Sequence, residues 1–450
     1  MPYTTDIKKL YKNFTQIPLS DIPFLYPSDH TMDSALTDYV NRKLPVRELS
    51  QAIAKDVEIK VMGIFDPHFE AYCKREDWIF KMLAERQRTS RKRFNFNRPK
   101  LYSVTDNKGK TFLVFTVMPG YEYVKQYGWF LRQFIDSYSP NKSEKLLTVA
   151  YDKYTCDNLG DWSDLVKDSG VKKDDVVILG YVDEFSNLFD KYGFQKIADN
   201  YSPEDSIYGH TVFLNNKNQR ILLLGVTYSY WGSIIGRISD GMYQNGAKEI
   251  IYAAKCGTLA DEEDIYKKLI IPRSFAIYEN GFDAFVSDSI QNNLREFQIP
   301  EMTGLHVSVP TVVGETYDQR EDLHRLGATS IDNELSHLAI SVQQNQKANP
   351  GIIMGSVHFS TDYVRRRKER GMKTSNDLST GRSSSAKALK ASILTRIGGI
   401  LFSYLSQYQP DDPKTPVSKT QSNVVNISED YLSTIQDELP WKSFTQDIFE

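Results

Sequence analysis

Three polar residues, Asp332, Asn333 and Glu334, stand where a strand-like run passes into a helix-like pattern. The run Ala328 to Ile331 is typical of a buried strand, and apolar residues return at helical spacing from Leu335. A carboxylate at such a junction can accept hydrogen bonds from a bound ligand. It can equally cap the helix that follows, which is the interpretation we favour for Asp332.

A second group of residues can hold an anion. Gly232 and Ser233 precede a helix-like segment, and backbone N–H groups at the start of a helix attract negative charge. Lys255 lies within the strand-like run KEIIYAAKCGTL. Its ammonium could bind an anion as a point charge, or it could pair with a carboxylate of the core.

The composition narrows the class of protein. The chain has 450 residues, a formal charge of −3 and 40% hydrophobic residues, which is typical of a soluble protein of two or three domains. Its three cysteines lie far apart, so we expect no disulfide framework and no metal site, and nothing indicates another cofactor. The sequence has neither a signal-peptide pattern nor an apolar run of about 18 residues, so we expect a cytoplasmic protein without a membrane span.

The pattern along the chain changes near residue 171. Residues 1–170 predict a mixed α+β domain. Residues 171–408 alternate strands and helices, which predicts an α/β domain with a mixed sheet flanked by helices on both faces. Residues 409–450 read as a linker rich in Pro, Ser and Asp, followed by an acidic, aromatic tail.

Several elements are specific enough to be tested. In the first domain we expect a helix over Asp77 to Gln87, a hairpin over Lys100 to Met118 and a helix over Tyr121 to Tyr138. In the second domain the expected strands are Asp175 to Gly180, Ile270 to Tyr278, Leu305 to Pro310, Ala328 to Ile331 and Ile352 to Ser356, with a last helix from Ser384 to Tyr408. In such sheets ligands bind at the carboxyl ends of the strands.

Five segments between residues 175 and 408 carry the clearest signal. In order they are RILLLGVTYSYWGSII, QNGAKEIIYAAKCGTL, LIIPRSFAIYENG, GETYDQREDLHRLGATSIDNELSHLA and PGIIMGSVHFSTD. In order and spacing this part of the chain resembles the nucleoside phosphorylase superfamily, which includes purine nucleoside and uridine phosphorylases and related nucleosidases. The fourth segment is similar to the family segment that ends in V-x-M-E-x-x-A.

The resemblance implies cleavage of the N-glycosidic bond of a purine nucleoside or nucleotide. It implies that Glu334, with Asn333 beside it, binds the ribose hydroxyls. The family commonly supplies an Asp after the last core strand to protonate the leaving base; here the Ser-Asp pair is displaced, and Asp362 is our candidate acid. His358 is the alternative. Either residue could instead be structural, Asp362 as a loop residue or helix cap and His358 as a strand-end histidine.

The anion site departs from the family pattern. Where many phosphorylases carry an Arg and a Ser, this chain has Tyr252 and Lys255, and a buried tyrosine cannot replace a guanidinium. These changes favour water slightly over phosphate as the nucleophile. They equally permit a catalytically degenerate module that binds or senses a nucleotide or serves in assembly. The residues expected to border the phosphate or nucleophile are Gly225, Gly232, Ser233, Lys255 and Gly257.

The base pocket and the partners are the remaining expectations. Tyr317 could stack on a base or belong to the core, and Glu315 could accept from a base amine or lie in the first turn of a helix. The basic run Tyr363 to Lys373 could contact nucleotide phosphates, and the run Arg86 to Lys100 could contact nucleic acid, although such runs are usually solvated. We expect a homo-oligomer, as in the family, and residues 1–170 could bind a partner protein.

Overall fold

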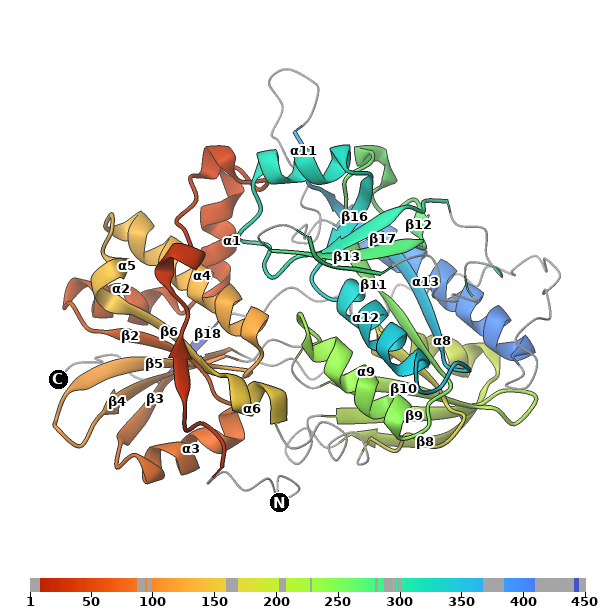
Figure 1. The fold of residues 1–450 in the computed structure, drawn as a ribbon, viewed down its shortest axis with the longest axis horizontal. Coiled ribbons are helices and arrows are strands. Elements are labelled where there is room, and N and C mark those ends of the chain that lie inside the picture. Colours follow the sequence, from red (N-terminus) through yellow and green to blue (C-terminus); the bar gives the residue numbers. More distant parts are fainter. Residues whose placement is uncertain are drawn as a thin grey trace.

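The structure is a computed structural model in which two units, each a sheet with helices around it, lie side by side (Figure 1). The structure describes residues 9–86, 94, 99–158, 169–201, 208–226, 229–279, 282–286, 294, 297, 301–366, 384–408 and 441–444. Most of the basic run from Arg86 to Lys100 and residues 367–373 of the second run lie outside these ranges, as does most of the predicted linker and tail.

The N-terminal unit is built on a seven-stranded sheet in the order β1-β6-β2-β5-β4-β3-β18. Its strands are β1 Phe14–Gln16, β2 Ile59–Gly63, β3 Ile79–Arg86, β4 Lys100–Thr105, β5 Thr111–Val117, β6 Leu147–Asp152 and β18 Trp441–Ser443. Its helices are α1 Ala35–Lys43, α2 Val46–Ala54, α3 Asp66–Arg75, α4 Tyr121–Tyr138, α5 Ser143–Leu146 and α6 Lys153–Asn158, with short 3-10 turns at Leu19–Asp21 and Pro27–Asp29. The predicted α+β character of this unit follows from these elements.

The hairpin of β4 and β5 is confirmed, and its cause is local. The side chain of Asp106 accepts hydrogen bonds from the backbone N–H groups of Lys108 and Lys110, both at 2.9 Å. Gly109 adopts a φ of 78°, which an L side chain rarely tolerates. Helix α4 has the predicted bounds, Tyr121–Tyr138.

The helix predicted over Asp77 to Gln87 is wrong, because these residues form strand β3. Phe80 and Met82 pair with β4, so the segment is held by a neighbour distant in sequence. On the other edge of β3, Trp441 pairs with Arg86, and Phe444 donates its N–H to Leu83 O at 2.9 Å. Part of the predicted tail therefore returns to the N-terminal sheet as β18 and covers its edge.

The C-terminal unit contains an eleven-stranded mixed sheet in the order β14-β13-β15-β16-β11-β7-β10-β9-β8, to which β17 is joined through β11 and β12 through β17. Its strands are β7 Val176–Gly180, β8 Gln195–Tyr201, β9 Tyr208–Leu214, β10 Arg220–Val226, β11 Glu249–Thr258, β12 Leu269–Ile270, β13 Ser274–Tyr278, β14 Phe282–Val286, β15 Leu305–Ser308, β16 Ala328–Asp332 and β17 Ile353–Tyr363. The helices are α8 Val182–Tyr192, α9 Ile234–Gln244, α11 Tyr317–Arg325, α12 Leu335–Gln346 and α13 Ser384–Gln407, with a 3-10 turn at Glu262–Asp264. The predicted α/β fold is confirmed.

Alternation along the central strands decides which helices cover which face. Ile250 and Tyr252 of β11 belong to one core cluster with α9, α12 and the N-terminal unit, whereas Ile251 and Ala253 belong to another with α8 and α13. Successive side chains of a strand point to opposite faces, so each face receives its own helix pair. Helices α9 and α12 consequently lie between the sheet and the N-terminal unit (Figure 1).

Strand β17 extends further than the sequence indicated. It continues past Ser356 to Tyr363 because β11 runs parallel to it as far as Thr258 and β12 pairs with it at Phe359. His358 and Asp362 are therefore strand residues and do not follow the strand end as predicted.

Helix α13 is apolar on average, although Lys390 and Arg396 interrupt its apolar run. Ala386–Gln407 is long and apolar enough to cross a membrane by length and composition alone, with 56% of its most apolar window buried in the protein. A buried core helix meets the same criteria, and Leu394, Ile397 and Leu401 belong to the core cluster that includes α8.

Candidate functional site

The junction of β16 and α12 is organised by Asp332. Its carboxylate accepts the backbone N–H of Glu334 at 2.9 Å and that of Leu335 at 3.1 Å, so it satisfies the open start of α12. The hydroxyl of Ser308, on the neighbouring strand β15, donates to Asp332 Oδ1 at 2.7 Å. The capping interpretation of Asp332 is confirmed by this geometry.

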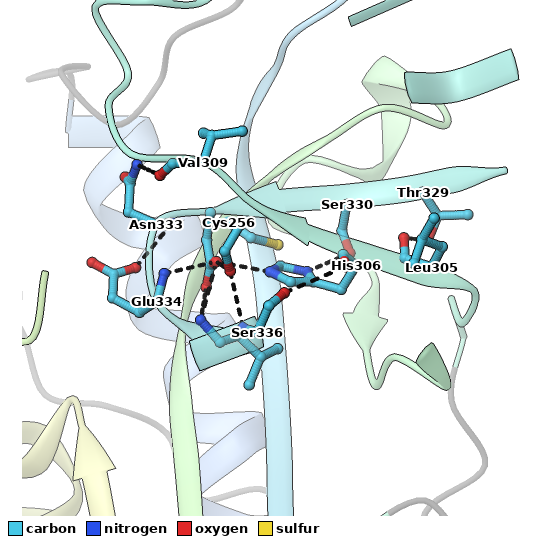
Figure 2. Close-up of polar contacts among 12 residues, drawn as sticks. Cys256, Leu305, His306, Val309, Thr329, Ser330, Asn333, Glu334 and Ser336 are labelled. Atoms are coloured by element: carbon cyan, nitrogen blue, oxygen red, sulfur yellow. Dashed lines mark hydrogen bonds and ion pairs between the residues drawn. The ribbon is translucent and has the colours of Figure 1, made fainter. Parts of the chain in front are cut away.

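A buried histidine completes the surroundings of Asp332 (Figure 2). Nε2 of His306 lies 2.8 Å from Asp332 Oδ1, and its Nδ1 shares a hydrogen bond of 2.8 Å with Ser330 Oγ. Burial alone would raise the pKa of Asp332, but the charge of His306, its hydrogen bond and the Ser308 hydroxyl lower that pKa to about 2. Asp332 is therefore an ionised, structural carboxylate and is not available to a ligand.

Glu334 has a different environment. Figure 2 shows its side chain directed away from His306, and it is only partly buried. Its Oε2 accepts the backbone N–H of Asn333 at 3.2 Å. Burial and then the negative charge of Asp332 raise its pKa to about 8, against the lowering effects of the Asn333 N–H and of Lys255. At neutral pH the Glu334 carboxyl thus holds a proton and can both donate and accept hydrogen bonds.

The pKa of Glu334 predicts how stability depends on pH. A folded-state pKa of about 8, above the ordinary 4.5, means that the folded protein binds a proton that the unfolded chain releases. The stabilisation is complete below about pH 4.5 and is lost as pH rises through about 8. Glu334→Gln removes this dependence, so the variant should gain in melting temperature relative to the wild type between pH 5 and pH 9. A difference in melting temperature that stays constant over this range would contradict the raised pKa.

Three further side chains surround Glu334. The charges of Lys255 and Glu334 both act on the Tyr181 hydroxyl, and Glu334 also acts on the buried Tyr252. Burial is the main cause that raises the pKa of each of these two tyrosines, so both phenols stay protonated. One carboxyl, one ammonium and two phenols thus gather near the ends of β7, β11 and β16. This group can bind a polyhydroxylated or anionic ligand.

His358 does not suit the role of a proton donor. It is fully buried, with its ring 5.2 Å from that of Tyr252 and 6.0 Å from that of His306. Among the described residues neither ring nitrogen has a hydrogen-bond partner. Burial lowers its pKa to about 3, so the imidazole is neutral at physiological pH. The structural interpretation of His358 is the one that these contacts favour.

Asp362, the other candidate acid, lies on β17 opposite Gly257 of β11. Its Oδ1 accepts the hydroxyl of Thr361 at 2.6 Å. A Cβ added at Gly257 would lie 3.1 Å from Asp362 Oδ2, so the glycine makes room for this carboxylate. Asp362 is partly exposed, as a group that meets a ligand must be.

The predicted anion site at the start of α9 is occupied by the protein itself, which corrects the expectation. Ser233 Oγ donates to Glu122 Oε2 at 2.9 Å, and a Cβ at Gly232 would come within 2.7 Å of the Glu122 side chain. Glu122 belongs to α4 of the N-terminal unit. Gly225 is likewise covered, because a Cβ there would lie 2.1 Å from the ring of Phe94. Of the predicted anion-binding residues, Lys255 remains exposed.

The predicted base-binding residues also lie elsewhere. Tyr317 is buried and donates its hydroxyl to Thr31 O at 3.3 Å. Glu315 accepts the Thr31 hydroxyl at 3.2 Å and pairs with Arg320 at 3.0 Å. Both side chains serve the contact between the two units, which a single sequence does not reveal. Asn333 donates its side-chain N–H to Val309 O at 2.6 Å, so it orders the loop before α11.

Sequence reasoning missed Tyr181, Glu184 and Lys390. Tyr181 follows Gly180 at the carboxyl end of β7, a position where ligands of such sheets commonly lie, and that signal could have identified it. Lys390 comes from α13, more than 200 residues later, and has no local signal. In the described part of the chain no group of three or more His, Cys, Asp or Glu is arranged to bind a metal ion.

Comparisons with known proteins give a sequence relative and similar solved structures. No family model matches this sequence. The chain is 27% identical over 366 residues to the protein named oxidoreductase cns1 from Cordyceps militaris, an alignment that covers 78% of this chain and 46% of the relative. The chain thus spans about half the length of the curated relative that it matches.

Similar solved structures include two nucleosidases and a phosphorylase. The 5′-methylthioadenosine nucleosidase of Arabidopsis thaliana is 15% identical, with a TM-score of 0.38 over 54% of this chain and 99% of its own. The 5′-methylthioadenosine/S-adenosylhomocysteine nucleosidase of Campylobacter jejuni is 10% identical, with a TM-score of 0.37 over 53% and 100%. A methylthioadenosine phosphorylase from an Antarctic soil metagenomic library is 12% identical, with a TM-score of 0.37 over 52% and 85%.

At such identities the likeness concerns the fold alone, and the activity is argued from the residues of the site. In the order of its motifs and the α/β build of its sheet, the C-terminal unit resembles the nucleoside phosphorylase and nucleosidase superfamily.

Proposed function

We propose that the C-terminal unit hydrolyses the N-glycosidic bond of a purine nucleoside or nucleotide. The observation that carries this proposal is the position of Glu334, a partly buried carboxyl with a raised pKa beside Tyr181 and Lys255. Asp332 takes over the capping of α12, which leaves the Glu334 carboxyl to a ligand. Two vicinal ribose hydroxyls can donate to its two oxygens and fix the sugar.

The reaction needs one bond broken and one formed at the anomeric carbon. Water adds to C1′ as the C1′–N bond breaks. The departing base takes up a proton and the attacking water gives one up to the solvent, so no net proton is consumed. Asp362 is the candidate source of that proton, since it is partly exposed and His358 is neutral and enclosed. Glu334, held at the start of α12, keeps the ribose oriented while positive charge develops on the ring.

Hydrolysis is favoured over phosphorolysis by the contact of Glu122 with Ser233. A carboxylate at the start of α9 competes with an anion for the same partial positive charge. Glu122→Gln should therefore raise the affinity for phosphate by roughly 2- to 30-fold. Glu279→Gln alters another interface carboxylate, the partner of Lys125, and is the matched control. Equal phosphate dependence of the wild type and both variants would remove this support for hydrolysis.

The direct test is the release of free base. The protein is incubated with AMP, adenosine and inosine, each with and without phosphate, and adenine or hypoxanthine is quantified by chromatography. Hydrolysis predicts release without phosphate and ribose or ribose 5-phosphate as the second product. Release that requires phosphate, with a sugar 1-phosphate as product, would reverse the assignment to phosphorolysis.

The second candidate is a binding module, favoured by the covering of Gly225 and Gly232 by the N-terminal unit. Such a module would bind a nucleotide tightly and release no base. Calorimetric titration with AMP beside the base-release assay separates the two functions. The activity named for the Cordyceps relative belongs to a protein about twice as long as the aligned part.

A further inference from the structure

Lys255 is a charged residue that hydrolysis leaves without a role. It is exposed although its neighbours along β11, Ala253, Ala254 and Cys256, are all buried. A lysine in the interior of a central strand is uncommon, because the strand faces are normally packed. Lys255 makes no ion pair with a carboxylate of the described residues. Its ammonium is nevertheless close enough to Glu334 to lower the pKa of that carboxyl.

A second lysine lies on the same side of the sheet. In the parallel ladder Lys255 pairs with Phe359 of β17, and residues in register point to the same face. The ring of Phe359 lies 5.8 Å from that of Tyr181, and Lys390 Nζ lies 4.8 Å from the centroid of the Tyr181 ring. Lys390 of α13 therefore contacts the Tyr181 ring directly, and Lys255 of β11 is in register with the Phe359 that packs against the same ring.

Among the described residues, charged groups from several elements act on Tyr181 and Lys390. Glu184, in the first turn of α8, acts on both Tyr181 and Lys390. Before a ribose binds, Glu334 contributes little negative charge at neutral pH, since it retains its proton. Burial lowers the pKa of Lys390. A buried ammonium behaves in this way when the nearby negative charge does not offset its loss of solvation. Lys255 and Lys390 thus place two ammonium-bearing side chains on the side of the sheet where Tyr181 lies, which favours the binding of an anion.

We propose that Lys255 and Lys390 bind the phosphate of a nucleoside 5′-monophosphate, so that the substrate is a nucleotide and not a free nucleoside. The inference rests on the proposed function, because it places the phosphate beside the ribose held by Glu334. Lysine ammonium groups bind phosphate as point charges, and Tyr181 can add one hydroxyl donor. The lysines supply affinity for the phosphate, and the reaction at C1′ is unchanged.

The test compares AMP with adenosine, without added phosphate, for the full-length protein and three variants. Lys255→Met and Lys390→Met remove the charges but keep most of the side-chain volume. Lys191→Met, exposed at the opposite end of α8, is the matched control. Each site variant should lower the ratio of kcat/KM for AMP to that for adenosine by roughly 10- to 100-fold, mainly through KM. The control should keep the wild-type ratio, and an unchanged ratio in both site variants would overturn the proposal.

A binding measurement separates this inference from the proposed function. Calorimetric titration with ribose 5-phosphate and with ribose needs no turnover. Tighter binding of ribose 5-phosphate that is lost in Lys390→Met supports the phosphate site even if no substrate releases base. Equal binding of the two sugars overturns the phosphate site even if adenosine is hydrolysed. Inorganic phosphate that accelerates the turnover of adenosine would mean that the lysines hold a nucleophile, which also overturns it.

Discussion

Replacing Glu334 by glutamine is expected to slow base release by about 100- to 1000-fold, because the neutral amide offers one acceptor oxygen where the carboxylate offers two, one for each ribose hydroxyl. Once a ribose is bound, two hydroxyl donors favour the ionised carboxylate, which glutamine cannot form. The side chain keeps its size, so the loss should appear in both kcat and KM and not in the amount of folded protein. The measurement is steady-state release of adenine from AMP and adenosine, with far-ultraviolet circular dichroism to verify folding.

The control for this variant is Glu263→Gln, which changes an exposed glutamate of the turn after β11. It should match the wild type in rate. Base release by Glu334→Gln within about threefold of the wild-type rate, well short of the expected loss, would refute the ribose-binding role. The proposed hydrolase would then lose its central residue.

Asp332→Ala is expected to lower the free energy of unfolding by about 3–5 kcal/mol. The substitution leaves the N–H groups at the start of α12, the Ser308 hydroxyl and the buried His306 without their acceptor. The partners of Asp332 outweigh its burial and hold its pKa at about 2, below the ordinary 3.8. The stabilisation that its ionised form gives to the folded protein is therefore present above pH 3.8 and is lost as pH falls through about 2. Urea denaturation at pH 7 measures the change.

The comparison for Asp332→Ala is Asp261→Ala. Asp261 is exposed and caps a single turn by accepting the N–H of Glu263 at 3.0 Å, so its loss should cost only about 1 kcal/mol. Similar costs for the two variants would show that the buried partners of Asp332 add nothing beyond an ordinary cap. The contacts of Asp332 with His306 and Ser308 would then add nothing to the free energy of unfolding.

Some site features were readable from the sequence because their causes are local. Asp332 caps the helix that begins three residues ahead, and it ends a short strand that contains the β-branched residues Thr329 and Ile331. Glu334 was singled out on its spacing and resemblance, and it does lie at the strand–helix junction. Lys255 was recognised as a charge within a strand, whereas Lys390, which lies over the Tyr181 ring, could not be identified from its position alone.

Other features were decided by partners far away in the chain. The role of Gly232 and Ser233 depends on Glu122, more than 100 residues earlier, and that of Tyr317 depends on Thr31. No local pattern encodes which surface the N-terminal unit covers. Ser233 of the predicted phosphate site and Tyr317 of the predicted base site therefore contact the N-terminal unit.

The sequence by itself determined the hairpin of β4 and β5, helix α4 and the capped junction at Asp332, because turn chemistry and periodicity act over a few residues. The tertiary structure alone decided that β3 is a strand, that β17 continues to Tyr363 and that the tail returns as β18. Each of these depends on backbone hydrogen bonds to a strand distant in sequence. Pairing of that kind is a property of the assembled sheet, whereas a cap or a turn is a property of its own residues.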